Sequence, residues 1–78
     1  MSKTREALKE VARTRLEVEL TDDVIESGKK FSDIGVDSLE AIELIVELEE
    51  ALDIELDDRR LDDVECIKDL AEYLAEFD

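Results

Sequence analysis

The most informative segment of the chain is residues 37–53, which read DSLEAIELIVELEEALD. Asp37 is a favourable N-cap residue, and Glu40 stands three residues later at the position of a capping box. At 100° per residue, one group of apolar side chains falls in an arc of about 100°, which is wide enough to face a core. These side chains are Ala41, Leu44, Ile45, Leu48, Ala51 and Leu52. The segment therefore predicts an amphipathic helix from Ser38 to about Leu52.

A second apolar stripe runs along roughly the opposite side of this helix. It consists of Leu39, Ile42 and Val46, and the carboxylates around it are those of Glu43, Glu49, Glu50 and Asp53. Residues 37–53 carry seven acidic side chains and no basic one. A narrow apolar stripe edged by carboxylates is typical of a docking surface. Two other interpretations stay open: the stripe packs under the preceding loop, or the carboxylates form an ordinary solvated face.

Further helices are predicted on both sides of this one. Apolar residues spaced by three and four predict helices over 3–16 and 65–77, and a short helical turn is expected at 57–61. Residues 17–36 lose this spacing and contain turn signals, so we expect a long loop there. The loop residues expected to anchor it to the core are Leu20, Val24, Ile25, Phe31 and Ile34. The predicted fold is all-α: a small up-down bundle of three longer helices and one short helix, with a long first loop.

Composition and charge restrict the possible partners. The chain has 78 residues, so residues 1–78 are expected to form one domain, and its formal net charge is −15. Residues 1–15 carry five basic and two acidic side chains, a net +3, so residues 16–78 carry −18. Repulsion argues against nucleic acid and anionic membranes, and basic protein surfaces are the expected counterpart. We also expect this repulsion to be relieved by added salt and by lowering the pH to about 5.

The sequence lacks residues that catalysis and metal binding usually require. The sequence has no His, no carboxylate in an evident apolar pocket, and one cysteine, Cys66, which is expected to be buried and inert. The acidic run at 53–58 does not fit the calcium loop of an EF-hand, because its sixth position is not Gly. We therefore expect neither an enzyme nor a metal site. The chain shows no signal region and no run of membrane-spanning length, which predicts a cytoplasmic protein without membrane insertion.

Ser38 is the first residue of the predicted helix, and its hydroxyl is expected to be exposed. A phosphate ester there would meet the positive end of the helix dipole, a gain of about 0.3–1 kcal/mol. The carboxylates of Asp37 and Glu40 oppose this gain, so the position suits a covalent phosphodiester better than a free anion. Helix physics alone favours a simpler interpretation, in which Ser38 is an ordinary first-turn residue, since Ser is common there.

Residues 34–40 read IGVDSLE and resemble the G-x-D-S-L attachment motif of acyl carrier proteins. The likeness covers nearly the whole chain and is strongest over residues 31–56. It implies that a phosphopantetheinyl transferase moves 4′-phosphopantetheine from coenzyme A to the hydroxyl of Ser38, with Asp37 and Leu39 beside it. The thiol of that arm would then hold an acyl group as a thioester.

The resemblance also implies partners for the second helix. Acyl-transferring and chain-elongating enzymes would bind this helix through basic patches, and we expect the carrier itself to be a monomer. The residues that stand where the family makes these contacts are Leu39, Glu40, Ile42, Glu43, Val46, Glu49 and Glu50. This set includes the whole second stripe, which was found from periodicity alone.

The residues around the motif bear on the cargo. Peptidyl carriers usually have a Gly-Gly pair before the motif, where this chain has Gly35-Val36. D-alanyl carriers usually have Phe after the serine, where this chain has Leu39. A cargo of fatty-acid or polyketide type is therefore preferred. The alternatives are a carrier of amino acids, and an acidic helical adaptor or inhibitor that binds a basic protein surface and carries nothing.

The chain departs from the family pattern in two places. Arg59 and Arg60 stand where an acidic pair is usual, which is expected to narrow the set of partners. The Thr that often caps the last helix is missing, so Asp62 or Asp63 is expected to cap it.

Overall fold

The computed structural model describes residues 2–78, and these residues form helices connected by short segments, with no strand among them. The α-helices are α1 (Lys3–Val11), α2 (Asp22–Glu26), α3 (Ser38–Leu52), α4 (Asp58–Leu61) and α5 (Ile67–Leu74). A π-helical turn, η1 (Ala12–Leu16), continues α1, a 3₁₀ turn, η2 (Phe31–Ile34), precedes α3, and a second 3₁₀ turn, η3 (Ala75–Phe77), continues α5. The all-α bundle of three longer helices is confirmed.

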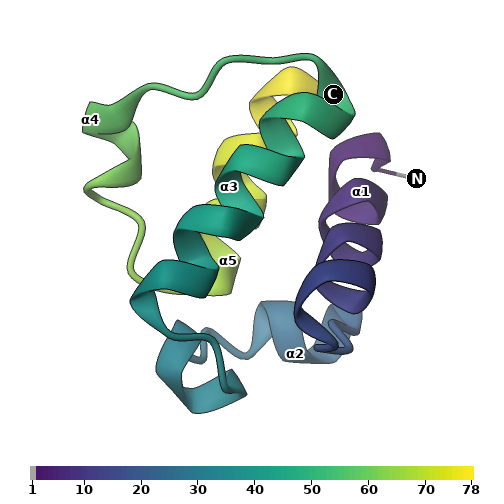
Figure 1. Cartoon of the computed structure of the whole chain (residues 1–78), viewed down its shortest axis with the longest axis vertical. Coiled ribbons are helices and arrows are strands. Elements are labelled where there is room, and N and C mark those ends of the chain that lie inside the picture. Colours follow the sequence, from purple (N-terminus) through teal and green to yellow (C-terminus); the bar gives the residue numbers. More distant parts are fainter. Residues whose placement is uncertain (1) are drawn as a thin grey trace.

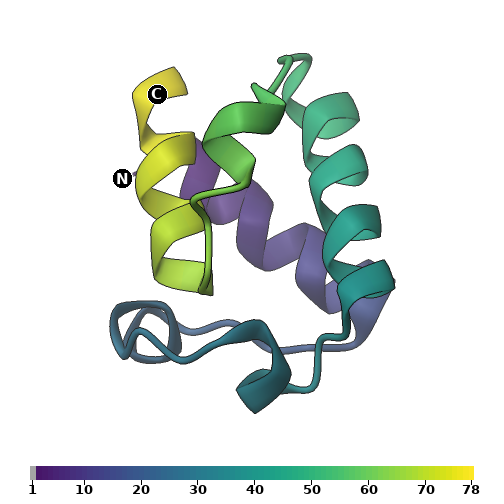
Figure 2. The same ribbon diagram turned by 90° about the vertical axis from the view of Figure 1, so that its left-hand side faces the viewer.

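The three longer helices pack around a common core. Figure 1 shows α3 in front of α5, with α1 beside them and α2 across their lower end, and Figure 2 shows α5 and α3 on opposite sides with α1 behind them. The helix α1 packs against both α3 and α5. The chain descends through α1, rises through α3 and rises again through α5 (Figures 1 and 2). Residues 53–66, which include α4, form the connection that returns the chain from the end of α3 to the start of α5 (Figure 2).

The long first loop is shorter than the sequence predicts, because two helical turns divide it. The hydroxyl of Thr21 accepts a hydrogen bond from the N–H of Val24 and thereby caps α2. Leu20 and Ile25 are buried in the core, as expected. The other three expected anchors, Val24, Phe31 and Ile34, are partly buried and pack against it. A single helical turn of this kind has too few residues to show a periodic pattern, so it is not predictable from spacing.

The core confirms most of the predicted inward face of α3, with one correction. Leu44 and Leu48 are fully buried, and Ile45 and Leu52 pack against the core. Ala51 is exposed, so its assignment to the core is wrong. It lies at one edge of the predicted arc, whereas Leu48 lies near the middle of that arc. Val36, which periodicity did not single out, is buried.

The start of α5 also differs from the prediction. The helix begins at Ile67, after Cys66, whose side chain makes no capping hydrogen bond and is half-buried. The carboxylate of Asp69 accepts a hydrogen bond from the N–H of Glu65 at 3.2 Å. A side chain from the first turn of α5 therefore accepts a hydrogen bond from the backbone just before the helix. The expected cap by Asp62 or Asp63 is wrong.

Arg60 holds the short helix α4 against α5. Its guanidinium lies 4.2 Å from the centre of the Tyr73 ring and pairs with the carboxylate of Glu76. The Tyr73 hydroxyl accepts a hydrogen bond of 2.8 Å from the N–H of Asp57, just before α4. Arg60 therefore has an intramolecular role, which the sequence comparison alone did not suggest.

Candidate functional site at the start of helix α3

Ser38 begins α3 on a backbone that is fixed from both sides. The carboxylate of Asp37 accepts a hydrogen bond from the N–H of Glu40 at 2.8 Å, and the Glu40 carboxylate accepts one from the N–H of Asp37 at 3.2 Å. This is the capping box that the sequence predicts. Before it, Gly35 takes the left-handed conformation (φ 81°), which glycine adopts without steric cost, and buried Val36 anchors the chain. The exposed hydroxyl of Ser38 is thus held at a defined position.

An open groove of about 830 Å³ lies beside Ser38. It is bounded by η2, the first half of α3, the last residue of α4 and the segment 62–65 that follows it. Its apolar walls include Val36, Ala41, Ile45, Leu61 and Val64. Its lining also includes charged residues, namely Lys30, Asp37, Asp62 and Glu65. A flexible molecule attached at Ser38 could lay an apolar segment into it.

The second apolar stripe is exposed. The side chains of Leu39, Ile42 and Val46 are 65%, 58% and 45% accessible, and Phe77 is the only other large hydrophobic residue exposed to this degree within residues 2–78. The interpretation that the loop covers this stripe is therefore wrong. A contiguous row of apolar side chains on one helix is unusual for a solvated surface and indicates an interaction.

The four carboxylates expected to contact partners fall into two groups. Glu43 and Glu50 are exposed and form no ion pair within the described part of the chain. Glu40 and Glu49 are half-buried and satisfy backbone donors: Glu40 in the capping box, and Glu49 by accepting a hydrogen bond of 3.0 Å from the N–H of Leu56. Of the expected contact residues, Glu40 and Glu49 thus stabilise α3 and its exit, and the freely available ones are Leu39, Ile42, Glu43, Val46 and Glu50.

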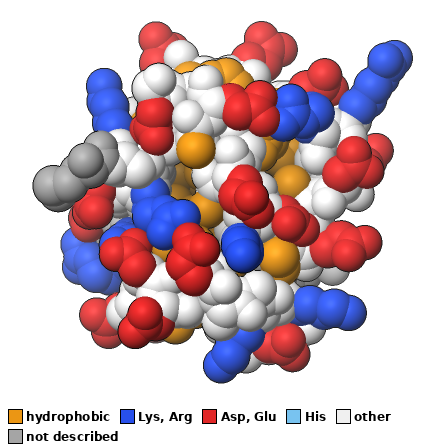
Figure 3. Space-filling model, turned by 180° about the vertical axis from the view of Figure 1, so that it is seen from behind, with side chains coloured by type: hydrophobic (Ala, Val, Ile, Leu, Met, Phe, Trp, Pro, Cys, Tyr) orange, Lys and Arg blue, Asp and Glu red, His pale blue; other side chains and the backbone are white. Residues whose placement is uncertain are grey.

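The opposite side of the molecule has a different charge pattern. Figure 3 shows acidic and basic side chains intermingled on the face away from α3. Arg5 pairs with Glu26 at 2.9 Å, and Lys9 pairs with Asp22 at 2.9 Å. On α3, by contrast, the one ion pair within residues 2–78 joins Glu47 to Arg15 at 3.4 Å. Within residues 2–78, α3 therefore presents the carboxylates of Glu40, Glu43, Glu49 and Glu50 without an ion pair, and it has no basic residue of its own.

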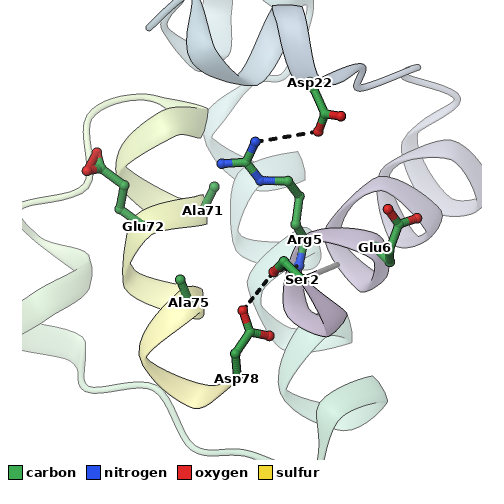
Figure 4. Close-up of a pocket in the computed structure, with 8 residues that line it drawn as sticks. All are labelled: Ser2, Arg5, Glu6, Asp22, Ala71, Glu72, Ala75 and Asp78. Carbon is green, nitrogen blue, oxygen red and sulfur yellow. Dashed lines mark hydrogen bonds and ion pairs between the residues drawn. The ribbon is translucent and has the colours of Figure 1, made fainter.

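A second pocket, of about 410 Å³, lies between the start of α1 and the end of α5 (Figure 4). Among its charged lining residues, Arg5, Asp22 and Asp78 have hydrogen-bond partners. Asp78 accepts hydrogen bonds from the N–H of Thr4 at 2.9 Å and from the hydroxyl of Ser2 at 2.7 Å. The backbone donor of Thr4, followed by the hydroxyl of Ser2, lowers the pKa of Asp78. These hydrogen bonds hold Asp78 against the start of α1.

Two negative findings complete the description of residues 2–78. No group of three or more His, Cys, Asp or Glu side chains is arranged to hold a metal ion. No helix in this part of the chain has the length and apolar character needed to cross a membrane.

The geometry at Ser38 can be set beside known proteins. The sequence profile of the family described as "Phosphopantetheine attachment site" matches residues 6–74. The chain is 36% identical to an acyl carrier protein of Zymomonas mobilis over 76 residues, which covers 97% of this chain and 96% of that one. It is 35% identical to an acyl carrier protein of Clostridium perfringens over 69 residues, 88% of this chain and 90% of that one. A shorter match, 44% over 43 residues, covers 55% of this chain and 53% of an acyl carrier protein of Syntrophobacter fumaroxidans.

The chain belongs to the acyl carrier protein family. Members of this family are carriers that bear covalent 4′-phosphopantetheine, and this agrees with the expectation that the chain is not an enzyme. The residues present fit that group: the hydroxyl of Ser38 is exposed at the first turn of a helix, and a groove with apolar walls adjoins it. The sequence analysis predicted the family, Ser38 and the apolar stripe, but not the groove or the position of Arg15.

Proposed function

We propose that this acyl carrier protein receives its 4′-phosphopantetheine arm on Ser38 and delivers acyl groups between enzymes of a fatty-acid or polyketide-type pathway. The observation that carries the proposal is the exposed Ser38 hydroxyl at the start of α3, inside the motif IGVDSLE and beside the apolar groove. The arm supplies a thiol on which acyl groups are held as thioesters. The protein contributes the attachment point and the surfaces on either side of it.

The surroundings of Ser38 favour a tethered phosphodiester. The free N–H groups of the first helical turn attract a phosphate, while Asp37 uses its carboxylate as the helix cap. Leu39 stands directly beside the serine on the exposed stripe, where a transferase would reach it. Asp37 and Leu39 are thus proposed to flank the attachment site, one by fixing the helix and the other by contacting the transferase.

The groove supports an aliphatic cargo over an amino acid. Its walls include apolar side chains from three segments of the chain, and burying a methylene group of an acyl chain there would gain about 0.8 kcal/mol. An aminoacyl group would bring a charged amine into the same place at a cost. A carrier of amino acids remains the second candidate, favoured only by the charged residues among those that line the groove.

The exposed face of α3 is the proposed docking surface. Leu39, Ile42 and Val46 supply an apolar centre, and Glu43 and Glu50 supply unpaired negative charge at its edge. The partners proposed for it are the phosphopantetheinyl transferase and acyl-transferring and chain-elongating enzymes with basic patches, which would associate faster through charge attraction. Glu40 and Glu49 are proposed to support this face. We also propose that the carrier acts as a monomer in the cytoplasm.

Intact-mass measurement tests the attachment site. The chain is incubated with coenzyme A and a broad-specificity phosphopantetheinyl transferase whose competence is verified on another carrier. Wild type is expected to gain one phosphopantetheinyl mass and Ser38→Ala none, while the control Ser32→Ala, which removes another exposed hydroxyl of the same groove, is expected to load normally. A wild-type chain that gains no mass would contradict the carrier and favour the acidic adaptor.

A further inference from the structure

Arg15 lies beside the docking surface although it belongs to a different helix. One nitrogen of its guanidinium is 3.4 Å from the carboxylate of Glu47 on α3, and the side chain is 61% exposed. Together with Ile42, Glu43, Val46 and Glu47 it lines an open hollow of about 460 Å³. The hollow therefore includes two of the three apolar side chains of the stripe, and its rim carries charges of both signs.

The wide turn η1 places Arg15 at this rim. Residues 12–16 form a π-helical turn, which contains more residues per turn than α1 and so changes the directions of the side chains that follow Val11. η1 packs against α3, and Glu17 ends it in the left-handed conformation (φ 56°). The backbone of η1 thus directs the Arg15 side chain toward the rim of the hollow.

The chemistry of Arg15 leaves it able to bind a partner. A guanidinium has five N–H donors, and the ion pair with Glu47 engages one of its nitrogens. The remaining donors suit a carboxylate, which arginine binds with defined geometry. A partner cation at the same place would be repelled, because it would face Arg15 at close range.

We infer that this hollow receives an apolar side chain of a partner enzyme whose docking patch carries a carboxylate opposite Arg15, next to the cations that face Glu43 and Glu50. The inference rests on the proposed docking surface, and it adds the kind of partner that this surface selects. A partner patch with only basic residues would bind this surface less tightly than a basic patch that also contains one acidic residue opposite Arg15. Arg15 therefore acts as a specificity determinant through repulsion of the wrong partner as well as attraction of the right one.

Helical peptides of known charge test the inference. One probe is an amphipathic helix with an apolar stripe flanked only by lysines, and the others replace a single lysine by glutamate at successive positions. Each is titrated into the ¹⁵N-labelled chain without the arm, and amide shifts give both the affinity and the location. Arg13→Glu is the matched control for Arg15→Glu, because Arg13 is 60% exposed and also has one carboxylate partner. That partner is Glu10, three residues earlier in the chain at 2.6 Å, and not a residue of α3.

For wild type we expect one glutamate-containing probe to bind about two- to fivefold more tightly than the all-lysine probe, the range given by one exposed ion pair. Shifts should centre on the hollow. Arg15→Glu should lose this preference and bind the all-lysine probe most tightly, while Arg13→Glu should keep it. Equal effects of the two variants, shifts centred elsewhere, or no saturable binding by wild type would overturn the inference. Since the arm is absent from these titrations, their outcome is independent of whether Ser38 is loaded.

Discussion

At the scale of single residues, Glu17 occupies a backbone conformation that does not suit its side chain. It ends η1 in the left-handed region (φ 56°, ψ 31°), which costs a residue with a Cβ atom about 1–2 kcal/mol. Glycine avoids this cost but loses more entropy on folding, about 0.4–1 kcal/mol. We therefore expect Glu17→Gly to stabilise the fold by about 0.5–1 kcal/mol, seen in a thermal melt as a rise of several degrees. Glu17→Ala removes the same charge but keeps the Cβ atom, so an equal rise in that variant would assign the effect to charge.

At the scale of elements, α3 separates a buried face from an exposed one, and each can be tested on the same helix. Val46 is on the exposed stripe, whereas Ala51 is also exposed but lies away from it. Val46→Asp adds a charge to the apolar centre of the docking surface, and we expect it to lower kcat/KM for transfer of the arm to Ser38 by roughly tenfold, which is about 1.4 kcal/mol. Ala51→Asp adds the same charge to α3 and should change kcat/KM by less than about twofold.

Both variants should keep their helical circular dichroism, since neither side chain is buried. If Ala51→Asp slows loading as much as Val46→Asp does, added negative charge and not the apolar stripe controls recognition. If neither does, the transferase contacts another surface.

At the scale of the whole molecule, mutual repulsion of the carboxylates is not the only effect that governs the response to pH. The pKa of Asp22 is lowered by Lys9 and Arg5, that of Glu76 by Arg60, and that of Asp78 by the N–H of Thr4 and the hydroxyl of Ser2. A carboxyl with a lowered folded pKa stabilises the fold above its ordinary value, here 3.8 for Asp and 4.5 for Glu, and this stability is lost as the pH falls through the lowered pKa. For these three groups acidification therefore removes stability, at pH values below the pH of about 5 at which relief of the repulsion is expected.

Asp78 provides the test, because it joins the end of the chain to the start of α1. We expect the melting temperature of wild type, at constant ionic strength, to fall as the pH is lowered below about 4. Asp78→Asn should be less stable than wild type at neutral pH and should lose less of its stability on acidification. Parallel curves for the two proteins would show that the bonds of Asp78 do not contribute to the pH response.

The sequence by itself determined α3, its capping box, the exposed hydroxyl of Ser38 and the apolar stripe. Each of these depends on residues within one or two helical turns, so periodicity and capping preferences were sufficient to predict them. The motif around Ser38 also determined the family, because IGVDSLE is continuous in the chain.

Only the tertiary structure decided the rest of the site. The burial of Val36, the exposure of Ala51, and the groove depend on how α3, η2 and the segment after α4 pack together. The ion pair of Arg15 with Glu47 and the contact of Arg60 with the Tyr73 ring join segments that are far apart in the chain. An ion pair or a groove of this kind arises from the distance between elements, and no local pattern of residues encodes that distance.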